Sequence, residues 1–331
     1  MTSRTSVPVS VLIVTWNSAE VLEACLDALA RSDPMPAELV VVDNASMDGS
    51  VAALEAFTQK AAFPVQMIKL DRNTGFAAGM NRAIASSSQP NVLLLNPDVR
   101  VEPGMIGRLH EVLDGAGPTT YAVGPKLRRA RGNGLEPTDV IDSTGIRMTR
   151  DGRHFDRGNG DRDAGQFDRP GEVFGLTGAA ALFRKSSLDG AKIDGEVFDE
   201  YFFAYREDAD LAWRMRGFGF HALYVPTAVG YHLRRVIPDK RRSLPPEINR
   251  HSVKNRFLLR IHHADRGWLL AFGLRSLVRD VIVIGACLTI ERSSLPGLVW
   301  LGRHWRRHMR RRRQILATRR VPSSDLRQWF R

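Results

Sequence analysis

The chain has 331 residues, 43% hydrophobic and 25% charged, so it can bury a sizeable core as one large α/β domain with an accessory segment. Its net charge of +12 is uneven: residues 234–331 hold 24 basic and six acidic residues, which leaves the first 233 residues acidic. The two cysteines, Cys25 and Cys287, lie far apart in apolar surroundings, which argues against a disulfide framework or metal knuckle and favours a reducing, cytoplasmic location.

The first hundred residues alternate between strand and helix patterns. Residues 9–15 form a β-branched run typical of a buried strand, too short and wrongly flanked for a signal peptide. Apolar residues then recur at helical spacing over 21–29, and a second buried strand follows at 38–43. The alternation continues through predicted elements at 49–57, 65–70, 79–85 and 92–95. This order predicts a doubly wound, mostly parallel sheet with helices on both faces.

Polar residues follow three of these strands. They are Thr15-Trp16-Asn17, Asp43-Asn44-Ala45-Ser46 and Asn96-Pro97-Asp98. Ligands of such sheets bind beyond the carboxyl ends of the strands, so we expect all three groups to meet at one crevice. Residues 129–172 are rich in Gly, Asp, Arg and Asn, which predicts a long surface excursion containing a hairpin.

Short motifs occur in a fixed order over residues 9–235. They are 13–17 (IVTWN), 42–46 (VDNAS), 73–81 (NTGFAAGMN), 95–98 (LNPD), 177–178 (TG), 206–213 (REDADLAW) and His232. In this order they resemble the family 2 inverting glycosyltransferases, specifically the bacterial rhamnosyltransferase-like branch. The resemblance implies a GT-A fold over residues 7–240. Composition and periodicity predict a basic, amphipathic helical segment over residues 241–331, which matches the family only loosely, through residues 255–257.

The resemblance assigns the nucleotide sugar to the strand ends. Asp43 stands where the family's base-reading carboxylate lies and would accept a hydrogen bond from N3–H of uracil or thymine, although the residues alone also fit a helix-capping turn. The glycines of 73–81 would let backbone N–H groups approach the nucleotide or its phosphates, or would simply make a tight turn. The predicted nucleotide-sugar residues are Thr15, Trp16, Asn17, Asp43, Asn44, Ser46, Asn73, Gly75, Phe76, Gly79, Asn81, Asn96 and Pro97.

A metal site is implied by the position of residues 96–98, which match the family's acidic metal motif with Asn96 in place of its first carboxylate. Asp98 remains as a hard oxygen ligand for Mg²⁺ or Mn²⁺, with the substrate diphosphate completing the octahedron. His232 matches the family's late histidine and is the second predicted protein ligand, although a lone histidine is more often a hydrogen-bonded structural residue. A single carboxylate predicts weak metal affinity without nucleotide.

Glu207 and Asp208 open a predicted helix, where carboxylates interact well with the helix dipole. The family match makes Asp208 the catalytic base for inversion and Glu207 an orienting or acceptor-binding group. Thr177 and Gly178 resemble a turn that lets the acceptor approach, or they form an ordinary turn. The aromatic residues around the helix are expected to be core: Tyr201, Phe202, Phe203, Tyr205 and Trp213.

The C-terminal part predicts an interfacial location. An apolar helical stripe in residues 268–290 comprises Leu270, Leu274, Leu277, Val281, Ile284 and Leu288, but its longest uncharged run is only ten residues, too short to cross a bilayer. The basic cluster 303–313, with Trp300 and Trp305, suits anionic headgroups, although a solvated face or an oligomer contact also fits. We therefore expect a peripheral protein at the inner face of the plasma membrane. Arg234, Arg235 and residues 240–242 would form a lid over the diphosphate.

The favoured donor is dTDP-L-rhamnose, with a UDP-linked galactofuranose or other hexose as the alternative, and the acceptor is a polyprenyl-linked or polysaccharide chain. A nucleic-acid-binding protein is the alternative of another class, prompted by a pI near 10.3. No nucleic acid is expected, because the basic residues follow an acidic body rather than a recognition motif. A nucleotidyltransferase should carry a glycine-rich, lysine-bearing signature near the first strand, and none follows Asn17. Homo-oligomerisation is left open.

Overall fold

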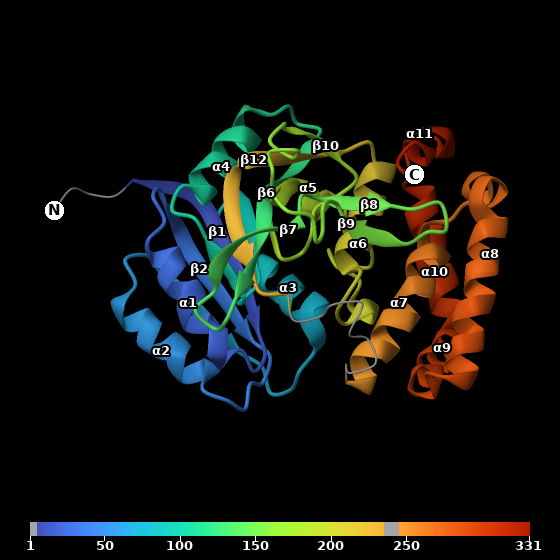
Figure 1. Ribbon diagram of the computed structural model, residues 1–331, viewed down its shortest axis with the longest axis horizontal. Coiled ribbons are helices and arrows are strands. Elements are labelled where there is room, and N and C mark those ends of the chain that lie inside the picture. The colour runs from blue at the N-terminus through green and yellow to red at the C-terminus, as the bar shows by residue number, and fades with distance from the viewer. Residues whose placement is uncertain (1–4, 235–244) are drawn as a thin grey trace.

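A mixed sheet forms the centre of the computed structural model, which describes residues 5–234 and 245–331 (Figure 1). Its strands are β1 (Ser6–Thr15), β2 (Met35–Asp43), β3 (Val65–Lys69), β4 (Asn91–Leu95), β5 (Val99–Val101), β6 (Thr120–Arg131), β7 (Glu136–Ser143), β10 (Gly171–Val173), β11 (Ala180–Arg184) and β12 (His221–His232). Their order is β10-β12-β6-β11-β4-β1-β2-β3, with β5 beside β12 and β7 beside β6. The neighbours from β4 to β3 are all parallel, whereas β11 runs antiparallel between β4 and β6.

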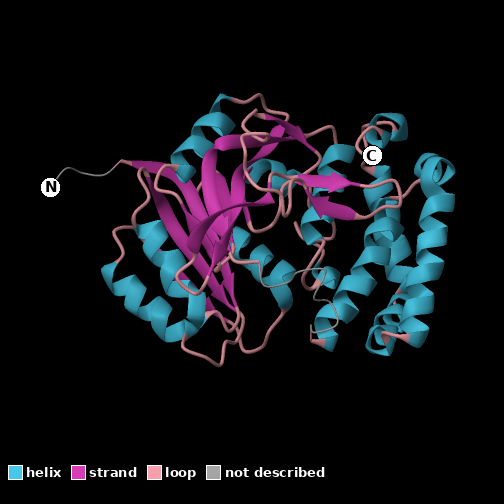
Figure 2. Ribbon diagram, viewed as in Figure 1, coloured by secondary structure: helices cyan, strands magenta, loops and turns pink. Residues whose placement is uncertain are grey.

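Helices cover both faces of this sheet, as the alternation predicts (Figure 2). They are α1 (Ala19–Ala30), α2 (Ser50–Lys60), α3 (Gly75–Ser86), α4 (Met105–Gly115), α5 (Lys185–Gly190) and α6 (Glu207–Gly217). Successive side chains of a strand point to opposite faces, so Val11 and Ile13 of β1 pack in the core with α1, α2 and α4. Leu12 and Val14 pack instead with α3, α5 and α6. The predicted α/β fold class is confirmed.

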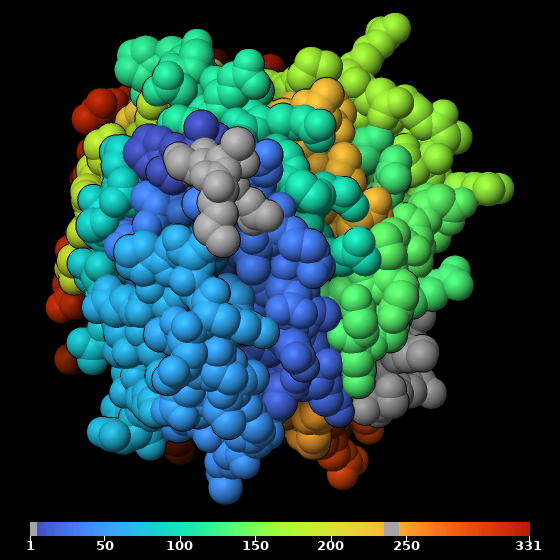
Figure 3. Space-filling model, turned by 90° about the vertical axis from the view of Figure 1, so that its left-hand side faces the viewer, coloured from blue at the N-terminus to red at the C-terminus, as the bar shows by residue number. Residues whose placement is uncertain are grey.

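The remaining helices form a separate layer beside the sheet (Figure 1). They are α7 (Pro246–His263), α8 (Arg266–Thr289), the 3-10 turn η3 (Arg292–Ser294), α9 (Leu295–Arg303), α10 (Trp305–Ala317) and α11 (Ser323–Arg327). A third core joins this layer to α6, where Trp213 packs with Leu258, Trp268 and Phe330. Figure 3 shows the face turned away from these helices. Blue residues of the N-terminal part cover most of this face, and green residues from the middle of the chain cover its right side.

The excursion over residues 129–172 contains the predicted hairpin, because β6 turns back into antiparallel β7. The expectation that it lies on the surface is only partly right. Ile141 and Asp142 of β7 are fully buried, since β7 pairs with a strand inside the sheet. A second hairpin, β8 (Ile146–Met148) with β9 (His154–Asp156), reaches towards the C-terminal helices (Figure 1).

The basic cluster 303–313 is divided between the surface and the body of the protein, since Arg303, Arg306 and Arg313 are exposed whereas other arginines bind residues of the body. Arg311 is buried and pairs with Glu196 and Asp199, Arg310 pairs with Asp194, and Arg312 donates to backbone carbonyls at the end of α7. These arginines fasten α10 to the body, because their carboxylate partners lie in a part of the fold that the linear sequence separates from them. Within residues 5–234 and 245–331, no helix is long and apolar enough to cross a membrane.

Candidate active site

The ends of β1 and β2 lie side by side, because Thr15 and Asp43 are register partners in the parallel pair. Thr15 Oγ1 donates to Asp43 Oδ1 at 3.0 Å, and the backbone N–H of Ser46 donates to Asp43 Oδ2 at 3.0 Å. The N–H of Asn17 donates to Ser46 Oγ at 3.0 Å. Each carboxylate oxygen accepts one bond and keeps a second lone pair. Asp43 thus holds the turn, as the helix-capping interpretation requires. Its oxygens can still accept a hydrogen bond from a nucleotide base. The neighbouring Trp16 is 53% exposed.

Asn44 ties this turn to the loop that precedes α3. Its Nδ2 donates to the Gly75 carbonyl at 2.9 Å, and its Oδ1 accepts from the N–H and the hydroxyl of Thr74, each at 3.0 Å. Asn73 Oδ1 accepts from the Gly75 N–H at 2.9 Å. Three of the predicted nucleotide-sugar residues therefore build one rigid loop at the crevice.

The two glycines of this loop let it pack closely against neighbouring side chains of the protein. Gly75 has a φ of +87°, and a Cβ there would lie 2.5 Å from the Phe203 ring; a Cβ on Gly79 would lie 2.8 Å from Val14. Asn81 uses its amide on the segment before α6, since Nδ2 donates to the Phe198 carbonyl at 2.8 Å and Oδ1 accepts from the Phe198 N–H at 2.9 Å. A direct nucleotide contact by Asn81 would have to replace these bonds.

Asp98 and His232 meet because β5 pairs with the end of β12 and sets Val99 opposite His232. The ring atom Nε2 lies 3.4 Å from Asp98 Oδ1, and Nδ1 lies 2.7 Å from Oδ2 of Asp142. Burial alone would lower the pKa of His232, but the two carboxylates outweigh it and raise that pKa to about 10. The ring is therefore a cation between two carboxylates.

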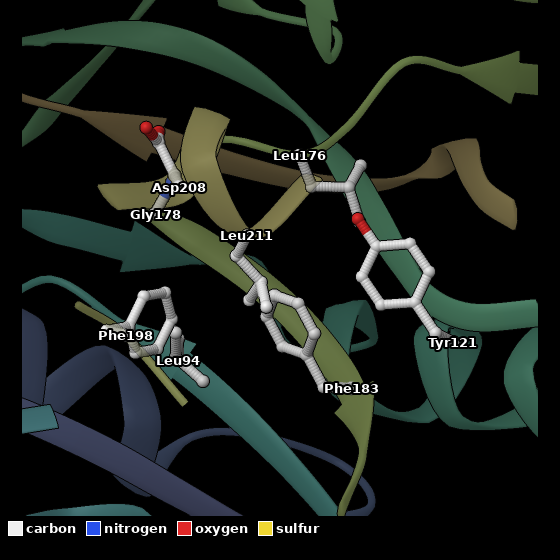
Figure 4. A pocket seen from close by; sticks show the side chains of 8 residues that line it. All are labelled: Leu94, Tyr121, Leu176, Gly178, Phe183, Phe198, Asp208 and Leu211. Carbon is white, nitrogen blue, oxygen red and sulfur yellow. The ribbon is translucent and has the colours of Figure 1, made fainter. Parts of the chain in front are cut away.

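Asp208 lies at the start of α6 with its carboxylate turned away from the aromatic rings beneath it (Figure 4). Oδ2 accepts from the Gly178 N–H at 3.1 Å and Oδ1 from the Ala209 N–H at 2.7 Å. Next to it, a small apolar cavity of about 10 Å³ is lined by side chains that include Tyr121 and Phe198. Burial raises the pKa of Asp208 to about 6, against the lowering effect of the two N–H donors.

Glu207 is more deeply buried than its neighbour, and its Oε2 has no hydrogen-bond partner in the described chain. Burial and the adjacent Asp208 hold the pKa of Glu207 well above its ordinary value. Two carboxyl groups side by side in a poorly solvated place do not both ionise easily, so they titrate as a pair. Perturbed carboxyl groups of this kind are typical of sites that move protons.

The residues before α6 hold an uncommon backbone conformation. Phe203, Tyr205 and Arg206 have φ values of +64°, +71° and +75°. Non-glycine residues adopt this region rarely, and only where their surroundings stabilise it. The fully buried Asn255 of α7 provides that support, since its Nδ2 lies 2.7 to 2.9 Å from the carbonyl oxygens of Phe202, Ala204 and Tyr205.

One strand pair brings the acceptor turn to the same place. Leu95 pairs with Ala180, and the Asn96 N–H donates to the Ala179 carbonyl at 2.9 Å, so the Asn96-Pro97-Asp98 group lies beside Gly178. Thr177 Oγ1 accepts from the Ala179 N–H at 3.4 Å and shapes the turn. A Cβ on Gly178 would lie 3.7 to 3.8 Å from Asp208, Glu207 and Phe76, in ordinary contact. The groups around residues 98, 178 and 208 therefore share one end of the sheet.

Comparison with known proteins agrees with this arrangement. The sequence model of Glycosyl transferase family 2 matches residues 10–190, more than half of the chain. The chain belongs to glycosyl transferase family 2. It is accordingly an enzyme that transfers sugars, and the predicted family is confirmed.

Among the relatives of this family 2 transferase is the N-acetylglucosaminyl-diphospho-decaprenol L-rhamnosyltransferase of Mycobacterium tuberculosis. It is 29% identical over 310 residues, which cover 86% of this chain and 93% of the relative. Residues 1–349 of S. aureus TarS share the fold with a TM-score of 0.54 at 16% identity, over 88% of this chain and 77% of that TarS chain. The mannosyltransferase PcManGT of Pyrobaculum calidifontis, in complex with GDP-Man and Mn²⁺, also shares the fold. Its TM-score is 0.52 at 18% identity, over 96% of this chain and 86% of the PcManGT chain.

The oxygen atoms of the site suit a hard cation in part. Asn96 Oδ1 and Asp98 Oδ1 are buried and have no hydrogen-bond partner in the described chain. Oxygen donors are what Mg²⁺ and Mn²⁺ prefer. The described residues contain no group of three or more His, Cys, Asp or Glu side chains that could hold a metal ion. In this family 2 transferase, phosphate oxygens of the donor would therefore have to complete the coordination of a bound Mg²⁺ or Mn²⁺.

Three residues of the transferase that the sequence did not single out for the site surround the predicted ones. Asp142 and Asp156 both bind Arg234, at 2.6 Å each, and Asn255 of α7 supports the strained segment. Tyr205 of that segment is 37% exposed, so the expectation that it lies in the core is wrong. Arg234 is thus fixed between two carboxylates rather than free to close as part of a lid. Arg235 and residues 240–242 of the predicted lid lie outside the described residues. Only Asn255 had a signal, in the loosely matching stretch 255–257.

Proposed function

We propose that this family 2 transferase moves an L-rhamnosyl residue from dTDP-L-rhamnose to a lipid-linked acceptor, with inversion at the anomeric carbon. The M. tuberculosis relative supports the sugar and the acceptor class, since its similarity extends over 93% of its own length. The observation that carries the chemistry is the Asp208 carboxylate, bonded to the Gly178 N–H at 3.1 Å beside the Asn96-Pro97-Asp98 turn. We place the donor across the ends of β1, β2 and β4, with Asp43 reading the base.

Asp208 is the general base of the proposed reaction. The acceptor hydroxyl passes its proton to the carboxylate while its oxygen bonds to the anomeric carbon, and the bond from that carbon to the diphosphate oxygen breaks on the opposite face. With a pKa of about 6, Asp208 is ionised near neutral pH and is a stronger base than an ordinary aspartate. Glu207 orients the acceptor, and Thr177 and Gly178 leave it room.

Asp98 and His232 are the residues that would hold Mg²⁺ or Mn²⁺, together with the donor phosphates. When bound, the cation would offset the negative charge that grows on the departing diphosphate. His232 must release its proton to act as a ligand, so cation affinity should rise with pH. Asp142 then keeps the ring oriented through Nδ1.

A donor panel tests the reaction. Purified protein is incubated with dTDP-L-rhamnose, UDP-galactofuranose or UDP-hexoses, with Mg²⁺, Mn²⁺ or a chelator, and a short polyprenyl-diphosphate-linked N-acetylglucosamine. We expect transfer from dTDP-L-rhamnose to exceed transfer from each UDP sugar at least tenfold, and the chelator to abolish it. Preference for a UDP sugar would replace rhamnose by the alternative donor and leave the family assignment intact.

The C-terminal helices support a peripheral location at an anionic membrane. The outer side of α8 exposes a continuous apolar surface, with Leu270 79%, Leu274 76% and Val281 63% exposed. Such a patch marks an interaction surface in a protein with so basic a C-terminal part. We propose residues 241–331 as the membrane-facing and acceptor-binding segment and residues 7–240 as the donor-binding domain.

Sedimentation with phosphatidylglycerol vesicles at physiological salt tests this location. The full chain should sediment, and the double change Leu270→Ser with Leu274→Ser should return most of it to the supernatant. Met47→Ser is the matched control, because Met47 is 94% exposed and lies outside the C-terminal helices, between β2 and α2. A wild-type protein that stays in the supernatant would overturn the proposed location.

A further inference from the structure

A cationic cavity of about 340 Å³ lies between α7 and α9, apart from the crevice at the strand ends. It is lined by Arg250, His251, Lys254, Pro296, Gly297, Trp300 and Arg303. This lining contains three basic side chains and no carboxylate. The proposed reaction uses none of these residues directly.

The basic side chains of this cavity have no carboxylate in direct contact among the described residues. Within residues 5–234 and 245–331, no carboxylate forms a salt bridge with Arg250, Lys254 or Arg303. Lys254 is only 5% exposed; its ammonium donates to the Tyr201 carbonyl at 2.5 Å and lies 4.5 Å from the centre of the Trp300 ring. Arg250 Nε and His251 Nδ1 are buried without a hydrogen-bond partner in the same described ranges. A buried donor without an acceptor, such as Arg250 Nε, is costly, and the neighbouring Lys254 and Arg303 add positive charge, so the cavity suits an anion.

The shape of the cavity depends on Gly297. A Cβ there would lie 3.0 Å from the Arg250 carbonyl oxygen and 3.3 Å from the Lys254 Cβ, so only glycine lets α9 approach α7 this closely. On the outer side of α9, Val299 is 52% exposed, and η3 connects this helix to the apolar surface of α8 (Figure 1). A ligand with a charged head and an apolar chain would find both parts of its surface here.

Two contacts connect the cavity to the proposed base. His251 stacks on Phe203 with ring centres 4.7 Å apart and planes 12° apart, and Lys254 binds the Tyr201 carbonyl. Both partners belong to the segment that leads directly into Asp208. An anion held in the cavity would therefore contact α7 beside the strained segment that precedes Asp208. It would not contact the predicted donor loop, residues 73–81.

We propose that this cavity binds the diphosphate of the lipid-linked acceptor, as a second phosphate site separate from that of the donor. Arginine and lysine together suit such a group, since arginine binds phosphate oxygens in pairs and lysine supplies a compact charge. The inference rests on the proposed function for the nature of the acceptor. A phospholipid headgroup shares the chemistry of a phosphate on a lipid chain, and the first experiment separates the two sources.

Isothermal titration of the full-length protein with farnesyl diphosphate, without added metal, tests the cavity itself. Arg250→Gln and Arg303→Gln should each weaken binding about tenfold, the usual effect of one charged hydrogen bond. Arg306→Gln is the matched control, because Arg306 is an exposed arginine of α10 outside the lining, and it should stay within about twofold of wild type. Equal affinities in all variants, or equally tight binding of dihexanoyl-phosphatidylglycerol, would overturn the proposal.

Steady-state transfer separates failure of the cavity from failure of the reaction. With a short polyprenyl-diphosphate-linked acceptor, Arg303→Gln should raise the acceptor KM about tenfold, with the donor KM as the internal reference. If wild type transfers no rhamnose but the titration shows the expected pattern, the proposed function fails and the phosphate site stands. If transfer occurs and the acceptor KM is unchanged in both cavity variants, the site fails and the function stands.

Discussion

Two aspartates on α6, two residues apart, have opposite surroundings. Asp208 faces the end of the sheet, accepts two backbone N–H groups and has a pKa raised to about 6 by burial. Asp210 faces α7, is fully buried, and lies 2.7 Å from His263 Nε2 and 3.3 Å from the Arg214 guanidinium. Burial would raise the pKa of Asp210 too, but these partners hold it well below its usual value.

The comparison distinguishes a carboxylate that can take up a proton, Asp208, from a carboxylate that stabilises the fold, Asp210. At Asp208, desolvation outweighs the two N–H donors and the nearby Arg206, so its pKa stays raised, which is the situation expected of a base. Asp210 joins α6 to α7 through His263 and also pairs with Arg214 inside α6. Five experiments test whether this division is real.

The largest effect is expected for Asp208→Asn, which removes the proton acceptor and keeps the shape. The rate of transfer should fall about a thousandfold, within the range for loss of a general base. Asp114→Asn, the same change at an exposed position of α4, should retain full activity. An Asp208→Asn protein as active as wild type would remove this residue from the mechanism.

Asp210→Asn should instead destabilise the fold. It leaves the buried Arg214 without its carboxylate partner, and breaking a buried pair costs about 3 kcal/mol. Urea unfolding of this variant beside Asp114→Asn measures the difference. A free energy of unfolding within about 0.5 kcal/mol of wild type would mean that the buried pairs of Asp210, with Arg214 inside α6 and with His263 of α7, contribute nothing.

The pH profile tests the carboxyl pair without mutation. A base must be deprotonated, so at saturating Mg²⁺, where the pH dependence of cation binding drops out, kcat/KM should fall about tenfold per pH unit as the pH drops below about 6, and should be level above it. Glu207 titrates with Asp208, so the apparent value belongs to the pair. A profile that stays level down to pH 5 would contradict the raised pKa.

Asn255→Ala should separate positioning from binding. It removes the amide that holds the strained carbonyls before α6, so kcat should fall about tenfold while the donor KM stays constant. Asn133→Ala, at an exposed turn between β6 and β7, is the control. An equal loss in kcat and in donor affinity would show that Asn255 acts only through general stability.

The smallest expected effect is a gain in stability. The folded-state pKa of Asp208 is above its ordinary value, so the folded protein holds this proton more tightly, and stability falls as the pH rises from about 4 through about 6. At pH 7 the Asp208→Asn change removes the remaining penalty and should stabilise the fold by about 1 kcal/mol, reduced from the full shift because the side chain is partly exposed. Thermal unfolding at pH 5 and pH 7 checks the sign, and equal stability of the two proteins at pH 7 would oppose it.

Much of this molecule follows from local sequence. Strand and helix periods predict the order from β1 to β4, and because parallel strands end at one edge, they also place the groups around residues 15, 43 and 96 together. The ordered motifs identify the family before any coordinates. The apolar stripe of α8 is equally readable, since its spacing depends on the helix alone.

Other features depend on residues that only folding brings together. Asp142 has no motif around it, yet it holds His232 because β7 folds back beside β6. The composition of α10 suits anionic headgroups, but two of its arginines, Arg310 and Arg311, bind carboxylates more than a hundred residues away. The difference between Asp208 and Asp210 has the same origin. Periodicity describes a residue's own segment, whereas its charge state and partners depend on what packs against that segment in three dimensions.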